Sequence, residues 1–113
     1  MAIGSDNVRD SLYPFGDYDM VENFRQSMAF YHLDQNIGES LAMIGPMPGL
    51  MMGVSPVGSL TTGRPANLII FDALNLGEIV ARPQMNRVVL LNGRHVKDTL
   101  PEFPDIAGRF VSP

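Results

Sequence analysis

The sequence lacks cysteine and tryptophan, and it has only one lysine and two histidines in 113 residues. Without cysteine there is no disulfide scaffold, no thiolate zinc site and no thiol nucleophile. The formal net charge of −4 and the single lysine, Lys97, argue against binding to a nucleic-acid backbone. No apolar run approaches about 18 residues, so we expect no membrane span. The first residues have no basic stretch followed by an apolar one, so we expect no secretory signal and a cytoplasmic location.

The chain is rich in residues that interrupt regular structure, with 9 prolines and 11 glycines, and it also has 8 methionines. Its hydrophobic content of 45% is typical of a globular protein. We therefore expect short elements. A small chain of short elements has difficulty burying a complete core of its own.

Helical patterns dominate the first half. A helix is predicted over 18–33, where Asp19 and Glu22 have the spacing of a capping box and apolar residues recur every three or four positions. A second helix should begin at Asn36 and end before the proline-rich stretch 46–49. A short third helix is predicted over 74–81.

Strand patterns dominate the second half. We predict a buried strand over 67–71, a strand over 86–91, a two-residue turn at Asn92–Gly93 and a return strand over 94–97. Residues 1–4 are predicted as a short buried strand, and the tail from 100 as extended chain. The fold class is α+β. The sequence pattern changes from helical to strand-forming near residue 55. This change predicts two parts, 1–55 and 56–113.

Candidate site residues cluster near the N-terminus. Asp6 follows the first predicted strand, where a carboxylate could bind a metal or move a proton, although aspartate is also a common turn residue. The acidic set could suggest a hard-cation site, but its spacing fits no calcium loop and its last member is accounted for as a helix cap. That set is Asp6, Asp10, Asp17 and Asp19.

The other residue types give weaker evidence for a functional site. His32 and His95 have no partner histidine nearby, and we expect neither to be a metal ligand. Ser5 and Ser59 lack the context of a nucleophile. Four methionines could form a soft-metal or peptide-binding surface, but filling a core is the favoured interpretation. They are Met43, Met47, Met51 and Met52.

Several segments, in this order, resemble one family: 4–10 (GSDNVRD), 13–20 (YPFGDYDM), 60–71, 82–84, 87–89, 92–94 (NGR) and 99–101. The chain resembles the C-terminal part of bacterial cytosine-deaminase-like members of the metal-dependent amidohydrolase superfamily. The first two segments are the more specific. The strand around Asn67 is shared across the superfamily, and Asn67 replaces the more usual aspartate there.

The resemblance implies an eight-stranded (β/α) barrel combined with a small β-sandwich. This chain would then supply the last strand–helix unit of the barrel and the C-terminal strands of the sandwich. By the same resemblance, Asp6 binds a divalent metal, zinc or iron, and moves a proton, and Asn7 lies beside the substrate. Arg9 and Asp10 would support their loop.

The histidines that hold the metal in that family, including an H-x-H pair, are missing here. We therefore expect part of a larger hydrolase of non-peptide C–N bonds, a cytosine-type deaminase acting on a small heterocycle, that is inactive alone. Its partner would be the missing N-terminal barrel portion or a second copy, with apolar faces exposed at Met20, Phe24, Met28 and Ile69. Two alternatives stay open: a stand-alone, non-catalytic oligomeric α+β module, and an amidohydrolase acting on a triazine or a cyclic amide.

Overall fold

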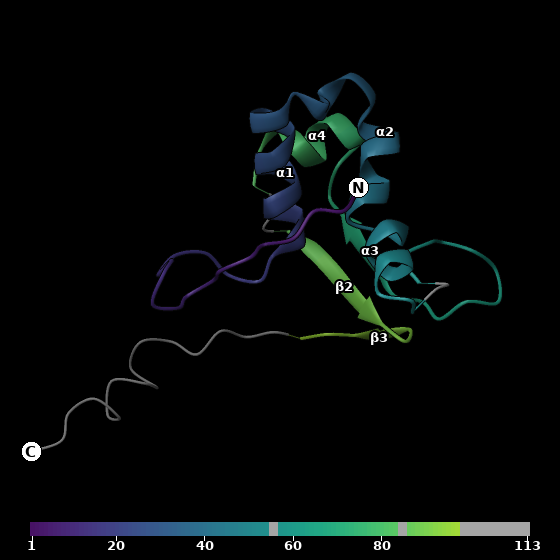
Figure 1. Ribbon diagram of the computed structural model, residues 1–113. Helices are drawn as coiled ribbons and strands as arrows, with labels where there is room; N and C mark the ends of the chain where they lie inside the picture. The colour runs from purple at the N-terminus through teal and green to yellow at the C-terminus, as the bar shows by residue number, and fades with distance from the viewer. Residues whose placement is uncertain (55–56, 84–85, 98–113) are drawn as a thin grey trace, which may run out of the picture.

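The computed structural model describes residues 1–54, 57–83 and 86–97, and it shows a small α+β arrangement (Figure 1). Its helical elements are α1 (Met20–Tyr31), the 3-10 turn η1 (Leu33–Asn36), α2 (Ile37–Ser40), the 3-10 turn η2 (Leu41–Met43), α3 (Pro46–Met51) and α4 (Leu76–Ala81). The strands are β1 (Leu68–Phe71), β2 (Arg87–Leu91) and β3 (Arg94–His95). The predicted α+β class is confirmed. In this part of the chain no helix has the length and hydropathy that crossing a bilayer requires.

Helix α1 forms where the capping pattern and the apolar stripe predict it, with shorter ends. Asp19 is the N-cap, and its side chain accepts a hydrogen bond from the Val21 amide at 3.0 Å. Val21, Phe24 and Met28 form the buried face. The helix ends at His32, whose backbone is left-handed at φ 52° and whose amide bonds back to the Met28 carbonyl.

The proline-rich stretch differs from the prediction. Asn36 caps α2 as expected, accepting from the Glu39 amide at 3.2 Å. However, Pro46 begins α3 instead of only ending the preceding helix. A proline is well accommodated in the first turn because its missing N–H would have no partner inside the helix there.

The three strands form one antiparallel sheet in the order β1-β2-β3. Leu68 pairs with Leu90 and Phe71 with Arg87, and the predicted Asn92–Gly93 turn joins β2 to β3. Both turn residues have positive φ, 51° and 73°. The Asn92 amide donates to the side-chain oxygen of Asn67 at 2.7 Å, and the Gly93 amide donates to the Ala66 carbonyl at 3.0 Å. The return strand is shorter than the predicted 94–97.

Two strand predictions are wrong in part. Residues 1–4 are not a strand: Ile3 donates one backbone hydrogen bond, to the Met43 carbonyl at 2.9 Å, and none of the described strands lies beside them. The strand β1 forms, but it is not buried, because Ile69 and Ile70 are 39% and 52% exposed. Neighbouring residues of a strand point to opposite faces, so both faces of β1 are incompletely covered.

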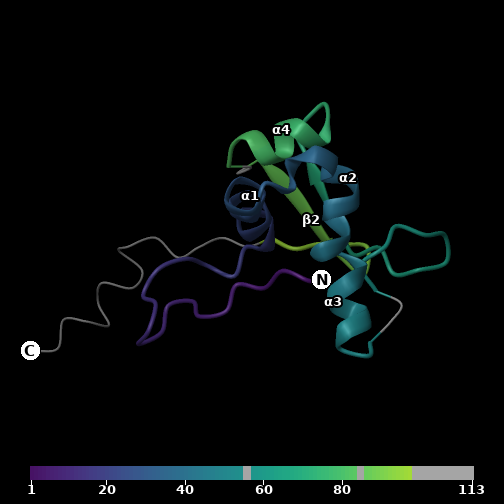
Figure 2. The ribbon, with the colours of Figure 1, turned by 45° about the horizontal axis from the view of Figure 1, so that its top comes forward.

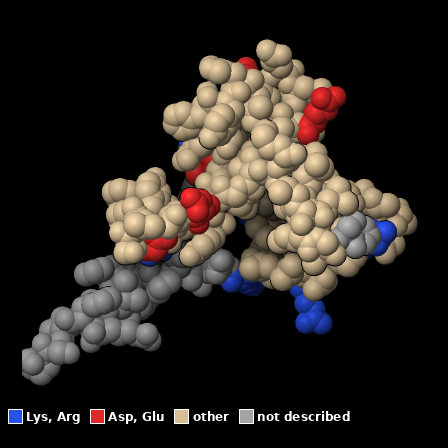
Figure 3. Space-filling model, in the orientation of Figure 1, with Lys and Arg blue, Asp and Glu red and all other residues tan. Residues whose placement is uncertain are grey.

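The buried hydrophobic core of the described residues is small: Val8, Val21, Phe24 and Met28. The expectation that Phe24 and Met28 would be exposed is therefore wrong, whereas it is confirmed for Ile69. Met51 and Met52 are 71% and 69% exposed, so they do not fill the core as expected. Most of the face in Figure 3 is uncharged, with scattered acidic and basic side chains.

Helices α1, α2 and α4 gather at one end of the sheet, and α3 lies apart from them (Figures 1 and 2). Figures 1 and 2 show α1, α2 and α4 together at the upper end of β2, with the β2–β3 turn pointing away from them. Helix α4 contacts both α1 and α2, so elements on either side of residue 55 touch. The boundary at residue 55 stays a prediction, and the predicted extended tail from 100 lies outside the described residues.

Candidate functional site

Residues 5–18, the purple excursion in Figure 1, form a loop that closes on itself just before α1. We refer to them as the 5–18 loop. The Arg9 side chain donates through Nε to the Gly16 carbonyl at 2.7 Å, and the Arg9 amide donates to the Phe15 carbonyl at 3.3 Å. The Tyr18 hydroxyl lies 3.5 Å from the Val8 carbonyl that it donates to. These contacts join the two ends of the loop.

Asp10 organises the inner turn of this loop. Its Oδ1 accepts hydrogen bonds from the amides of Leu12 and Tyr13 at 2.8 and 2.9 Å. Its Oδ2 accepts from the Asn7 side-chain amide at 2.7 Å. The Tyr13 amide, followed by the Leu12 amide and Asn7, lowers the pKa of Asp10 below its ordinary value. Three hydrogen bonds therefore hold the Asp10 carboxylate within the loop.

Asp6 lies next to this network without joining it. Its side chain is exposed and has no hydrogen-bond partner among the described residues. Its backbone is left-handed at φ 56°, as is that of Arg9 at φ 50°. Such a conformation costs an L-residue of the order of 1 kcal/mol, and it persists only where the surrounding contacts determine it.

A cleft of about 430 Å³ opens between the loop and the first two turns of α1. Its walls are mostly polar or charged. They are formed by Ser5, Asn7, Val8, Arg9, Tyr13, Gly16, Asp17, Asp19, Glu22, Asn23 and Gln26. Three of these side chains are carboxylates, and three others, Asn7, Asn23 and Gln26, are amides that can both donate and accept hydrogen bonds. The cleft can therefore present donors and acceptors to a polar ligand. Asp6 is not among the residues that line it.

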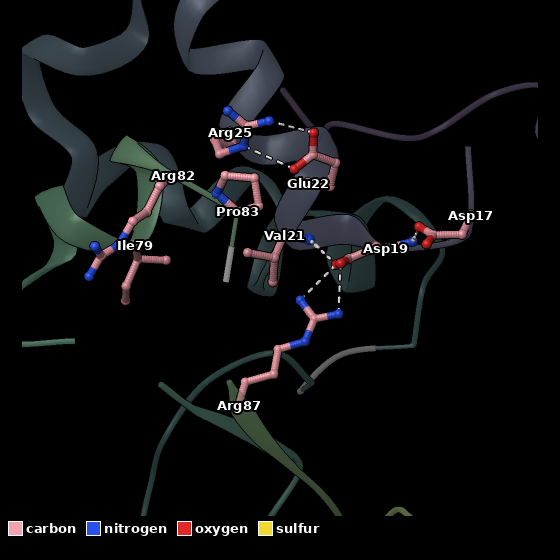
Figure 4. Close-up of a pocket in the computed structure, with 9 residues that line it drawn as sticks. All are labelled: Asp17, Asp19, Val21, Glu22, Arg25, Ile79, Arg82, Pro83 and Arg87. Atoms are coloured by element: carbon pink, nitrogen blue, oxygen red, sulfur yellow. Dashed lines mark hydrogen bonds and ion pairs between the residues drawn. The ribbon is translucent and has the colours of Figure 1, made fainter. Parts of the chain in front are cut away.

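A second cleft of about 210 Å³ adjoins the first at the α1 N-terminus and shares Asp17, Asp19 and Glu22 with it (Figure 4). Arg87 forms a two-pronged ion pair with Asp19, with Nη2–Oδ2 at 2.7 Å and Nη1–Oδ1 at 3.0 Å. Beside it, Arg25 pairs with Glu22 at 2.6 Å. In each pair the geometry of the guanidinium matches that of the carboxylate. The positive and negative charges on this wall of the cleft therefore offset each other.

The ion pairs shift the pKa values of their members. Burial raises the pKa of Asp19, but the hydrogen bonds and charge of Arg87 outweigh it, so the pKa lies below the ordinary 3.8. The hydrogen bonds of Arg25 hold the pKa of Glu22 below its ordinary value, and Glu22 raises the pKa of Arg25 in return.

The structure brings some of the predicted site residues together and not others. Asn7, Arg9 and Asp10 share one hydrogen-bonded loop, and the supporting role of Arg9 and Asp10 stays a prediction. Within the described parts of the chain, no three His, Asp or Glu side chains are grouped closely enough to hold a metal ion. Asp6, Asp10, Asp17 and Asp19 do not form such a group, and the residues present do not by themselves fit the zinc or iron that the resemblance implies.

Sequence reasoning missed Arg87. It assigned this residue only to a strand, because its partner Asp19 lies 68 positions away and no local pattern connects the two. The single available signal was a charged residue at the first position of an otherwise apolar strand.

Comparison with known proteins identifies a related sequence. The chain is 35% identical over 105 residues to a pterin deaminase from Rhizobium rhizogenes, a match that covers 93% of this chain and 24% of that protein. The chain thus spans about a quarter of the length of this curated relative. No family profile matches the chain, and no solved structure matches it. The similarity supports a relation to deaminases of the amidohydrolase type. It does not support the cytosine-type specificity in particular, and the barrel origin of residues 1–55 is not confirmed by any solved structure.

Proposed function

We propose that this chain is part of a hydrolase that deaminates an amino-substituted heterocycle, and that Asp6 is its catalytic carboxylate. The similarity to a pterin deaminase, 35% identity along nearly the whole chain, carries the proposal. The left-handed backbone of Asp6 supports it, because strained conformations concentrate at active sites.

The proposed substrate class is a ring in which a carbon doubly bonded to nitrogen carries an amino group. A pterin has this arrangement, and so does cytosine. In the reaction, water adds its oxygen to that carbon, the amino group leaves as ammonia, and a ring carbonyl results. A pterin is the first choice, since the relative is named for it, and cytosine is the second.

Asp6 is proposed to move a proton between the attacking water and the leaving nitrogen. An exposed carboxylate with no hydrogen-bond partner in the described chain is available for this work. Its proposed role as a ligand of zinc or iron rests on the family resemblance alone. A complete metal site would need ligands from outside these residues.

The proposed partner is a polypeptide that corresponds to the other three-quarters of the relative. We expect the 113 residues alone to release no ammonia from pterin or cytosine, with or without added Zn²⁺ or Fe²⁺.

A chimera tests the proposal. The 105-residue segment of the Rhizobium rhizogenes enzyme that matches this chain is replaced by the sequence of this chain. We expect ammonia release from pterin, and a loss of about 10²–10⁴-fold in kcat on Asp6→Asn, the range that general acid–base groups contribute. Asp34→Asn, at an exposed position in η1, is the matched control and should leave kcat unchanged. An active chimera that tolerates Asp6→Asn would refute the role of Asp6.

A non-catalytic interaction module is the second candidate. Among the described residues, the contrast between four buried hydrophobic side chains and many exposed ones favours it, because exposed apolar surface often marks an interface. The chimera separates the two candidates, because only part of a deaminase restores ammonia release from pterin in it. One tightly bound metal ion per chain would contradict the interaction module.

A further inference from the structure

One ion pair connects the 5–18 loop to the second half of the chain. Asp19 follows the loop directly and caps α1, and Arg87 is the first residue of β2. Both side chains are only 25% exposed, and two hydrogen bonds join them at 2.7 and 3.0 Å. A guanidinium that meets a carboxylate through two parallel bonds fixes direction as well as distance.

From Asp19 a series of short contacts leads back to the start of the loop. The Asp19 amide donates to both the carbonyl and the side chain of Asp17. The neighbouring Gly16 carbonyl accepts from the Arg9 side chain at 2.7 Å. Three positions before Arg9 is Asp6, and Asn7 between them bonds to Asp10. These contacts reach Arg9 and Asn7, and Asp6 is linked to them only through the backbone next to Asn7.

Besides these contacts, the Asp10 hydrogen bonds define the inner turn of the loop, and burial of apolar side chains contributes little. Within the stretch 5–18, only Val8 is buried, and the other side chains are exposed or partly exposed. Two of its residues, Asp6 and Arg9, hold left-handed backbones that an unconstrained chain would leave. Polar contacts at the two ends of the loop must therefore maintain a conformation that apolar packing does not.

We propose that Arg87 is a positioning residue: through its ion pair with Asp19, the β2–β3 hairpin fixes the conformation of the loop that carries Asp6. The catalytic consequence rests on the proposed function, whereas the conformational consequence does not. Arg87 thus acts on Asp6 at a distance and touches neither substrate nor reacting atoms.

NMR spectroscopy of the 113-residue chain tests the conformational part. In Arg87→Gln we expect the amide resonances of residues 6–18 to shift. We also expect hydrogen-exchange protection of the Arg9 and Asp10 amides, which bond to Phe15 and Tyr13, to fall by about tenfold. The Val96 amide, bonded to Val89 in the sheet, should keep its protection. Arg94→Gln, an exposed arginine of the same hairpin, is the control and should change neither region.

Asp19→Asn provides a second variant. It keeps an N-cap oxygen for α1 but removes the charge that Arg87 binds. It should reproduce the loop changes if the ion pair matters, and it decides the question by the same measurement if Arg87→Gln fails to fold. Unchanged loop amides in the folded variant would overturn the proposal. Equal loss of protection in loop and sheet would do the same, because it would show a purely structural role.

The active chimera tests the catalytic part. We expect Arg87→Gln to lower kcat by about tenfold with little change in KM, since a displaced catalytic group affects the chemical step more than binding. Arg94→Gln should leave both constants unchanged. If Arg87→Gln disturbs the loop but not kcat, the positioning of Asp6 is refuted while the deaminase function stands. If Asp6→Asn has no effect in an active chimera, the role of Asp6 fails and the NMR result on the loop is unaffected.

Discussion

Four residues other than glycine have left-handed backbones in the described chain: Asp6, Arg9, His32 and Asn92. Two of them have an evident local reason. His32 ends α1, and Asn92 occupies a hairpin turn that requires positive φ. Asp6 and Arg9 border no helix end or hairpin turn. The contacts of the 5–18 loop maintain their conformation. At Asp6 the left-handed backbone lowers stability, whereas the proposed function requires the aspartate.

Substitutions at Asp6 should reveal this conflict. Asp6→Gly should be more stable than Asp6→Ala by about 1 kcal/mol, because glycine adopts positive φ without the steric cost that alanine meets. Chemical denaturation of the purified variants measures the difference. At Asp34, in the 3-10 turn η1, the order should be the usual one, with alanine better than glycine by about 0.5–1 kcal/mol. The same order at both positions would mean that Asp6 is not held left-handed in solution.

Residues that act on near neighbours were predictable from the sequence. Asp19 as a cap, Asn36 as a cap and Asn92–Gly93 as a turn all follow from contacts within a few positions. Arg87 was not predictable, because its partner lies in a different element. For Asp6 the sequence alone indicates that a carboxylate stands at this position. That the side chain is exposed and lies outside the polar cleft depends on the path of the loop, which the sequence does not reveal.

At the scale of elements, the N-terminus of α1 is one of the places where the two halves of the chain meet. Asp19 serves both as the helix cap and as the partner of Arg87, so one carboxylate stabilises the helix and attaches it to β2. The prediction that the stretch 46–49 only ends a helix failed at this scale for a physical reason. Proline is excluded from a helix interior but favoured in its first turn, and the sequence pattern does not distinguish a helix that ends at Pro46 from one that begins there.

Acid should weaken the attachment of α1. Because the folded pKa of Asp19 lies below 3.8, the folded state binds fewer protons than the unfolded state in that region. The stabilisation is therefore complete above about 3.8 and is lost as the pH falls through the folded pKa. In Arg87→Gln the free energy of unfolding should depend less steeply on pH there, because the main cause of the lowered pKa is gone.

Denaturant unfolding at several pH values on either side of 3.8 measures this slope. Arg87→Gln should also cost about 1–3 kcal/mol at neutral pH, as expected for hydrogen bonds to a charged, partly buried partner. Arg94→Gln should retain the slope of the original chain. An equal slope in both variants would exclude the ion pair as the source of the acid sensitivity.

At the scale of the whole molecule, apolar surface exceeds what the small core uses. The 5–18 loop alone exposes Leu12 at 81%, Phe15 at 66% and Tyr18 at 77%. The hydrophobic effect favours covering such side chains, whether by a second copy or by the rest of a larger enzyme. This excess was expected from the many short elements, but its location was not, because α1 buries Phe24 and Met28 while the loop remains open.

We expect the isolated chain to self-associate at micromolar concentrations through this surface. Replacing Leu12 and Phe15 with serine should shift the protein toward monomer in analytical ultracentrifugation, because the side chains that drive association are lost. Leu74→Ser is the comparison variant and should have a smaller effect. It removes a side chain that is 91% exposed but lies in the second half of the chain, outside the 5–18 loop. A chain that is monomeric before any substitution would contradict the expectation.

The Asn92–Gly93 turn has a consequence for the chemical ageing of the protein. Asparagine followed by glycine is the sequence most prone to deamidation, since the glycine amide nitrogen can attack the asparagine side chain. In the folded chain that nitrogen donates its hydrogen to the Ala66 carbonyl at 3.0 Å, and both residues are held at positive φ. Folding therefore withholds the attacking atom, and slow conversion of Asn92 to aspartate or isoaspartate would record how much time each molecule has spent with this turn open.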